Sequence, residues 1–265
     1  MIAKRVPLLI LPLTLMLIAP CVGATDADAP AAGAAAAPTP EWTFPSSVDL
    51  ASEYIFRGLT QTNKKPALQA GFEADHQSGF YVGAWGSNIS WLSDLSALGA
   101  GNVSSSLELD GYFGYRTKLA DTIGLDFGLY TYYYPGSYPG GFTSPNTTEV
   151  YIAASYSIVS LKYSYALTNL FGFADTKNSG YLDLSANWEF VPTWILNGHV
   201  GRQEVNNLGV ASYTDWKLGV TKNFDAGWSL ALAYYDTNAN EAVYTNPYGT
   251  FQGRSTGVLT VTKTF

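Results

Sequence analysis

The chain has 265 residues, a single cysteine and a formal net charge of −7. This acidic balance argues against nucleic-acid binding, which needs a basic surface to neutralise phosphates. Aromatic residues make up 15% of the chain and charged residues only 13%, whereas charged residues reach about 25% in typical soluble domains. The composition is therefore unusual for a soluble domain.

Residues 1–24 have the organisation of a secretory signal peptide, with two basic residues, an apolar run at 6–19 and small residues at the cleavage site. The apolar run is too short to cross a hydrocarbon core of about 30 Å, which argues against an N-terminal membrane anchor. A lipoprotein signal with an acylated Cys21 is a second alternative, disfavoured by the preceding Pro20. We predict export with cleavage near Ala24, which removes the single cysteine and leaves no disulfide.

Residues 25–45 are rich in alanine and proline and show no periodicity, so we predict a flexible leader there. From Ser46 onward, apolar and polar residues alternate with the period of 2 that is typical of β-strands. The predicted all-β domain therefore occupies residues 46–265. Its strand-like runs are 47–58, 66–76, 79–90, 104–117, 121–134, 147–156, 159–169, 180–190, 193–203, 212–223, 227–238 and 254–265.

The connections between these runs alternate between short and long. Gln77-Ser78 and Val191-Pro192 are short, residues 135–146 and 239–253 are long, and the first connection, 59–65, is moderately long. Short periplasmic turns and longer extracellular loops are typical of transmembrane barrels. We therefore predict a transmembrane antiparallel β-barrel of about 12 strands, with a secreted β-sandwich or lipocalin-like barrel as the alternative.

The last run ends on an aromatic residue. Leu259, Val261 and Phe265 lie on one face, and the other face is mostly threonine. A strand with open edges is a template for aggregation, so we predict that this run pairs with the first one and closes the barrel. Many bacterial outer-membrane barrels also end on an aromatic residue. This pattern predicts that the C-terminal strand ending in Phe265 contacts the outer-membrane barrel assembly machinery.

Aromatic residues gather where such a barrel would meet the two interfaces of the outer-membrane lipid. The short-turn end carries Phe190, Trp194, Phe224, Trp228 and Phe265. The long-loop end carries Tyr54, Phe56, Tyr132, Tyr133, Tyr134, Tyr163, Tyr165, Tyr234 and Tyr235.

If the apolar faces meet lipid, the polar faces line the lumen. The side chains expected to set the field of the lumen are Glu53, Arg57, Glu73, Glu108, Asp110, Asp126, Glu149, Asp183 and Asp215. The same inward faces carry Asp49, Asp75, Arg116, Lys162, Glu189, His199 and Lys217. Among these residues, we expect Arg57 and Glu149 to matter most.

Two functions remain open for this lumen. In one, a narrow acidic channel passes small polar solutes, cationic or neutral. In the other, the charges pair across the lumen, with Glu53 near Arg57 on one strand, and the closed barrel acts through its extracellular loops. Barrels of about eight strands are filled by side chains and those of about 16 leave an aqueous channel. Twelve strands fall between these sizes and Tyr112, Tyr130 and Tyr132 point inward, so the sequence argues against a wide, unselective pore.

The sequence shows no motif for catalysis or for a cofactor. His76 and His199 are the two histidines, and His199 lies on a predicted inward face, away from lipid. Asp236 opens a segment like a calcium loop, but Glu241 stands where glycine is required and Pro247 where the closing glutamate belongs. We therefore expect no catalytic residue, cofactor or metal, and a lipid-modifying enzyme is the least favoured alternative.

Several blocks of the chain resemble the TorF family, a group of bacterial outer-membrane proteins regarded as porins from their fold. The blocks are SEYIFRG at 52–58 with Gln61-Thr62, KPALQAG at 65–71, GFYVG at 79–83, YYPG at 133–136, TEVY at 148–151, YTDWKLG at 213–219 and KTF at 263–265. The resemblance implies a Gram-negative outer-membrane barrel with a transport role and offers no catalytic residues. Lys263 departs from the apolar residue that usually occupies its position, although its stem could reach the periplasmic interface.

Overall fold

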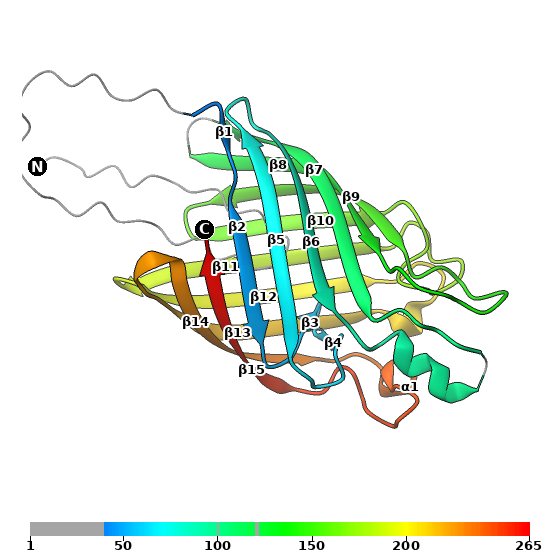
Figure 1. Ribbon diagram of the computed structural model, residues 1–265. Helices are drawn as coiled ribbons and strands as arrows, with labels where there is room; N and C mark the ends of the chain where they lie inside the picture. Colours follow the sequence, from blue (N-terminus) through cyan, green and yellow to red (C-terminus); the bar gives the residue numbers. More distant parts are fainter. Residues whose placement is uncertain (1–39, 100, 120–121) are drawn as a thin grey trace, which may run out of the picture.

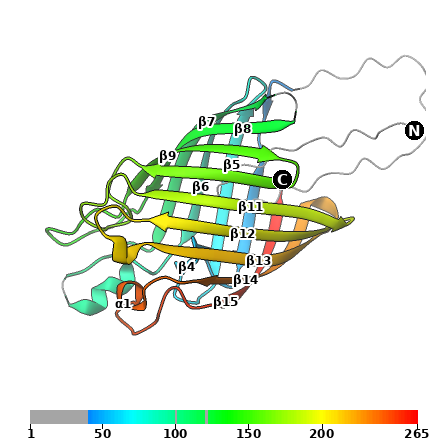
Figure 2. The same cartoon turned by 180° about the vertical axis from the view of Figure 1, so that it is seen from behind.

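The computed structural model describes residues 40–99, 101–119 and 122–265. The predicted signal peptide and most of the predicted leader therefore lie outside the described residues. Twelve antiparallel strands form a closed barrel, in which neighbours along the chain pair with each other. The final strand, β15 (Thr256–Thr264), pairs with the first barrel strand, β2 (Ser46–Ala51), and so closes the barrel (Figures 1 and 2). The prediction of a transmembrane barrel of about 12 strands is confirmed.

The remaining barrel strands agree closely with the predicted runs. They are β5 (Ala67–His76), β6 (Phe80–Asn88), β7 (Leu107–Leu119), β8 (Ile123–Tyr133), β9 (Thr147–Tyr156), β10 (Val159–Ala166), β11 (Gly180–Val191), β12 (Trp194–Glu204), β13 (Tyr213–Asn223) and β14 (Trp228–Thr237). The smaller elements are β1 (Trp42–Thr43), β3 (Ile55–Phe56), β4 (Leu59–Thr60), the 3-10 turns η1 (Ser93–Leu98), η2 (Gly209–Ala211) and η3 (Asp225–Gly227), and α1 (Glu241–Tyr244). Across the described ranges, no helix is long and apolar enough to cross a membrane.

The two ends of the barrel differ in their connections. One end carries the short turns and the C-terminus, on the left of Figure 1, and the other carries the long loops and α1. The long connections are residues 52–66, 89–106, 134–146, 167–179, 205–212 and 238–255. This is the predicted asymmetry of a transmembrane barrel.

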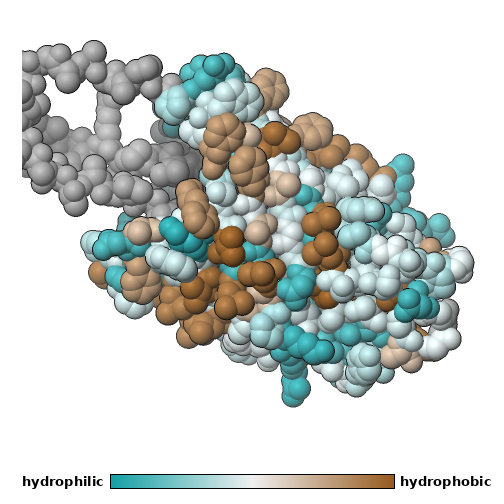
Figure 3. All heavy atoms as spheres, viewed as in Figure 1, coloured by the Kyte–Doolittle hydropathy of each residue, from teal (hydrophilic) through white to brown (hydrophobic). Residues whose placement is uncertain are grey.

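The strands alternate between an apolar outer face and a polar inner face. Leu232 on β14 is 61% exposed, whereas Asp215 on the neighbouring β13 is fully buried. Figure 3 shows hydrophobic side chains along the barrel wall and hydrophilic ones toward its ends. Outward apolar side chains are stable in lipid, where the closed sheet satisfies every strand hydrogen bond. This orientation excludes the soluble alternatives, because these would place the apolar face inward.

The predicted aromatic belt is present at the short-turn end. At the long-loop end, the prediction is partly wrong. Trp194 and Trp228 are exposed on the outer wall. Tyr54, Tyr132 and Tyr134 are instead buried. Tyr54 has left the wall after β2, and Tyr134 follows the end of β8 and packs among loop residues. Tyr132 lies on the inner face of β8, in agreement with its predicted inward position.

Tyrosine rings fill one side of the lumen. The Tyr112 ring lies over its cross-strand partner Gly83, where any Cβ would clash with the ring. Tyr81 lies over Gly114 in the same way. Tyr112 also stacks on Tyr130, with ring centroids 5.2 Å apart. The bulk of these rings on β6, β7 and β8 leaves the free space of the lumen mainly beside β10 to β15.

Candidate functional site: a constricted lumen

The segment after β2 folds into the barrel instead of extending its wall. The prediction of one strand over 47–58 is therefore wrong beyond Ala51. β3 and β4 pair as a small hairpin whose two-residue tip is Arg57-Gly58, with φ values of +46° and +76°. Two-residue hairpins favour positive φ at both tip positions, as in a type I′ turn, because this twist matches that of the paired strands.

The hairpin tip packs against the inner wall of the barrel at β13. A Cβ on Gly58 would lie 2.5 Å from the Cβ of Asp215 on β13, so a side chain there would prevent this close approach. Beside the tip, the Thr60 amide donates a hydrogen bond of 2.9 Å to the Gln252 carbonyl. The hairpin therefore leaves the wall after β2, enters the lumen and packs on β13, three strands away in the sheet.

Arg57 fixes the tip to two strands. Its terminal nitrogens donate to the Glu149 carboxylate on β9 at 3.0 and 2.7 Å, and to Gln203 Oε1 on β12 at 2.9 Å. The guanidinium also lies 4.2 Å from the centroid of the Tyr181 ring on β11. The two ion-pair side chains are only 7% and 3% exposed. The structure thus brings together the two residues expected to matter most, with Arg57 on a hairpin tip and not on a strand.

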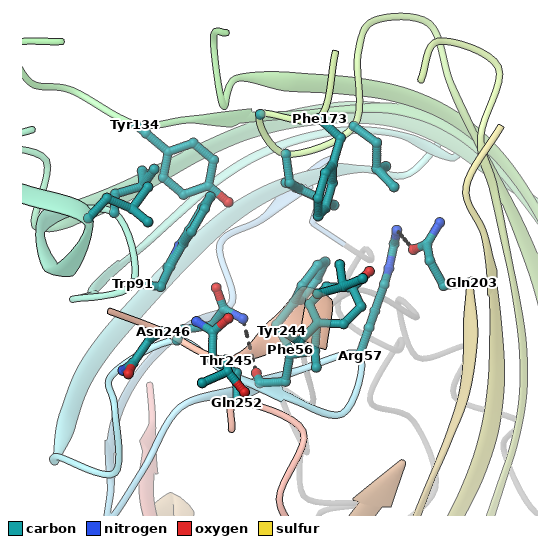
Figure 4. A pocket seen from close by; sticks show the side chains of 18 of the residues that line it. Phe56, Arg57, Trp91, Tyr134, Phe173, Gln203, Tyr244, Thr245, Asn246 and Gln252 are labelled. Carbon is teal, nitrogen blue, oxygen red and sulfur yellow. Dashed lines mark hydrogen bonds between the residues drawn. The ribbon is translucent and has the colours of Figure 1, made fainter. Parts of the chain in front are cut away.

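Two cavities meet at this tip. The outer cavity, of about 260 Å³, is lined mainly by residues of the long loops. The inner cavity, of about 280 Å³, is lined mainly by strand residues. Phe56 and Arg57 line both cavities and therefore mark the constriction between them. Figure 4 shows Arg57 beside Gln203 at the edge of the outer cavity.

The inner cavity has a polar and charged lining. Its charged residues include Asp49, Glu53, Lys162, Asp183 and Lys217. Such side chains favour water and hydrogen-bonding solutes over apolar ones.

His199 links two carboxylates at the wall of the inner cavity. Its ring nitrogens lie 2.6 Å from Asp183 Oδ2 and 2.6 Å from Asp215 Oδ2. The Tyr181 hydroxyl donates to the other oxygen of Asp215 at 2.9 Å. Two of the predicted lumen acids are therefore held by a histidine that sequence analysis placed on the same face.

A second buried ion cluster lies on the β5–β8 side of the lumen, toward the short turns. Arg116 on β7 pairs with Glu73 at 2.6 Å, with Asp75 at 2.9 Å and with Asp126 at 3.5 Å. Its guanidinium stacks over the Tyr81 ring, 3.6 Å from the centroid. Three acids that were predicted to face inward are therefore paired with one arginine.

The last predicted acids lie near tyrosines or hydroxyls. Glu108 accepts a hydrogen bond from Tyr54 at 3.0 Å and Asp110 from Tyr130 at 2.7 Å, and neither acid lines the two cavities. Glu53 accepts from the Thr256 hydroxyl at 3.0 Å.

Two sequence-based expectations need correction. Glu53 and Arg57 do not share a strand, because both follow the end of β2. Glu189 lies on the same face of β11 as Asp183, but it does not line the cavities: it is exposed at the short-turn end, where its carboxylate accepts from the Thr193 amide at 2.8 Å.

The aromatic and amide partners of Arg57, such as Tyr181 and Gln203, were not predicted from the sequence. The sequence does contain a signal for the hairpin. Arg57-Gly58 lies between Ile55-Phe56 and Leu59-Thr60, two short segments with strand propensity, and this pattern predicts a tight hairpin. Among the described residues, no group of three or more histidine, cysteine, aspartate or glutamate residues could hold a metal ion.

Comparison with known proteins assigns the family. A family model described as "Bacterial protein of unknown function (Gcw_chp)" matches residues 34–265. The chain belongs to this family. No curated protein matches its sequence.

Solved structures of small porins are similar to this Gcw_chp protein. The KdgM porin is similar with a TM-score of 0.52 and 9% identity, covering 83% of this chain and 98% of that porin. A KdgM porin in complex with disordered oligogalacturonate has a TM-score of 0.49 at 9% identity, covering 84% and 97% of the two chains. The NanC porin has a TM-score of 0.49 at 11% identity, covering 84% and 99%. The KdgM likeness shows that the chain has the barrel fold of a small porin.

Proposed function

We propose that this protein is a narrow outer-membrane channel that passes small polar solutes, neutral or cationic. The observation that carries the proposal is the pair of cavities, one facing the long loops and one inside the barrel, that meet at the Phe56–Arg57 tip. The resemblance to the TorF family supports a transport role and, with the predicted signal peptide, an outer-membrane location after export.

The lining of the lumen supports the class of solute. The described buried residues as a whole hold more acidic than basic side chains, which favours cations over anions. The inner cavity itself is lined by three acids and three bases, which favours neutral polar solutes. We assign direct contact with the solute to Glu53, Arg57 and Asp183, because these predicted residues line the inner cavity.

The other predicted residues would act through neighbours. Glu149 and Asp215 hold Arg57 and His199 in place. Glu73 and Asp126 hold Arg116, and Glu108 and Asp110 hold tyrosine hydroxyls. We assign no catalytic role, because the fold is that of porins and His199 faces the lumen between two carboxylates.

The ion-paired hairpin favours a second candidate function. If Arg57 stays bound to Glu149 at all times, the barrel is closed and acts through its extracellular loops. Both candidates predict a folded barrel, and only the first predicts conductance.

The deciding experiment is single-channel recording of the exported chain, purified from membranes and inserted into a planar bilayer under a salt gradient. We expect discrete steps and a cation-leaning reversal potential, which Glu53→Gln and Asp183→Asn should both move toward zero. Glu189→Gln is the matched control, because that exposed carboxylate lies outside the cavities. A folded, heat-modifiable barrel that stays electrically silent would contradict the channel and support the closed barrel.

A further inference from the structure

The outer cavity differs in chemistry from the inner one. Its lining is mainly aromatic and aliphatic, with aromatic rings from several long loops, among them Trp91, Tyr134, Phe173 and Tyr244 (Figure 4). Among the lining residues that the structure describes, Arg57 is the one with a charged side chain, and it already pairs with Glu149. Burial raises the pKa of the Tyr244 hydroxyl, which is therefore neutral. A ligand of this cavity would be uncharged.

Carboxamides interrupt the apolar lining. The side chains of Gln61, Gln203, Asn246 and Gln252 all line the cavity. An amide group both donates and accepts hydrogen bonds, which matches the hydroxyl group, itself a donor and an acceptor.

Two buried donors on residues that line this cavity have no protein partner. One is the Asn246 Nδ2 group, on a residue that is only 7% exposed, and the other is the Trp91 indole N–H. The orientation of Asn246 is fixed, because its Oδ1 atom accepts from the amides of Tyr248 at 3.0 Å and Thr250 at 2.9 Å. A buried donor without an acceptor costs about 1–3 kcal/mol, so a ligand whose acceptor atoms reach these donors would recover that cost.

Aromatic rings position these donors. The Trp91 ring meets the Tyr134 ring edge to face, with centroids 5.5 Å apart and an interplanar angle of 87°. Deeper in the same loop cluster, Phe171 packs edge to face on Phe56 at the constriction, 5.5 Å between centroids. The cavity thus presents apolar ring surfaces with hydrogen-bonding groups at their edges.

We propose that the outer cavity is a binding site for a neutral saccharide. A sugar ring has apolar C–H faces that pack on aromatic rings and a rim of hydroxyl groups that pair with amides and indole N–H groups. The ring oxygen and hydroxyl oxygens supply the acceptors for Trp91 and Asn246. Delivery of the saccharide from this site to the constriction rests on the proposed channel function. Binding of the saccharide in the outer cavity does not.

The test measures saccharide binding and channel conductance separately. The purified full chain in detergent is titrated with glucose and with maltose by isothermal titration calorimetry. Sorbitol is the open-chain control, because it has hydroxyl groups but no ring faces. Trp91→Phe keeps an aromatic ring and removes the N–H donor. Asn246→Asp keeps the oxygen that accepts the two loop amides and replaces the donor. Trp188→Phe, on the exposed outer wall, is the matched control.

We expect a saccharide to bind the unaltered protein, sorbitol to bind poorly, and each donor variant to weaken binding about two- to tenfold, as the loss of one hydrogen bond implies. Trp188→Phe should bind like the unaltered protein. Equal binding of sorbitol, no binding of either sugar, or unchanged affinity in both folded donor variants would overturn the proposal. A barrel that binds sugar but stays silent in the bilayer would refute the channel and leave the binding site standing.

Discussion

Replacing Arg57 with alanine tests the constriction most directly. The guanidinium joins the hairpin tip to Glu149 and Gln203 on two different strands. Arg57→Ala removes these bonds and leaves the Glu149 carboxylate, 3% exposed, buried without its cation. We expect the hairpin to leave its docked position, because release lets water reach that carboxylate.

The size of the effect follows from the burial of the pair. Removing one partner of a buried ion pair costs about 3–5 kcal/mol. At about 1.4 kcal/mol per factor of ten, the ratio of docked to released hairpin falls by about two to three and a half orders of magnitude. Since this hairpin separates the two cavities, the single-channel conductance should rise.

The assay is the conductance of each variant in a planar bilayer, after heat-modifiability has shown that the barrel is folded. Arg202→Ala is the matched control, because Arg202 pairs with Glu204 on the surface, where the two side chains are 44% and 64% exposed. An exposed ion pair contributes about 1 kcal/mol or less to stability, and Arg202 lines neither cavity. The conductance of Arg202→Ala should therefore equal that of the unaltered protein.

Gly58→Ala undocks the hairpin by a second route that keeps the ion pair's charges. The added Cβ would lie 2.5 Å from the Asp215 Cβ, so the tip must retreat from the wall. If Arg57→Ala and Gly58→Ala both conduct like the unaltered protein while folded, the hairpin is not the constriction and the reasoning fails.

Two further predictions concern the stability of the barrel in lipid vesicles, measured by urea unfolding. Arg116→Met leaves the buried Glu73 carboxylate without its arginine and should lower the free energy of unfolding by about 3–5 kcal/mol; a loss below 1 kcal/mol would show that the cluster is hydrated. Gly83→Ala places a methyl group against the Tyr112 ring and should cost about 1–3 kcal/mol, whereas Gly111→Ala, with open space around it, should not. Equal stability of the two alanine variants would contradict the assigned packing of ring on glycine.

Much of the wall was predictable from the sequence because its signal is local. The period of 2 is set by the pleat of each strand, so residues such as Leu182 and Asp183 reveal opposite faces without knowledge of their neighbours. Loop lengths are equally local, and their alternation predicted the orientation of the barrel. The closure of β15 onto β2 followed from the need to satisfy strand edges.

The constriction was not predictable in the same way. Both the continued strand and the inward hairpin satisfy the alternation around Ile55 and Phe56, so the local pattern does not separate them. The space left beside the tyrosine-filled side of the lumen allows the hairpin to enter. The family-like opening block contains Arg57, but its sequence does not show that Arg57 lies on a hairpin tip.

The sequence alone determined the closed barrel, its lipid-facing side and the acidic character of its interior, because pleat, loop length and composition are properties of neighbouring residues. Only the tertiary structure decided which charges meet. Arg57 and Glu149 lie 92 positions apart in the chain, and their contact depends on how far each strand is shifted along the barrel. The outer cavity likewise exists only where Trp91 and Asn246, from two different loops, line the same space.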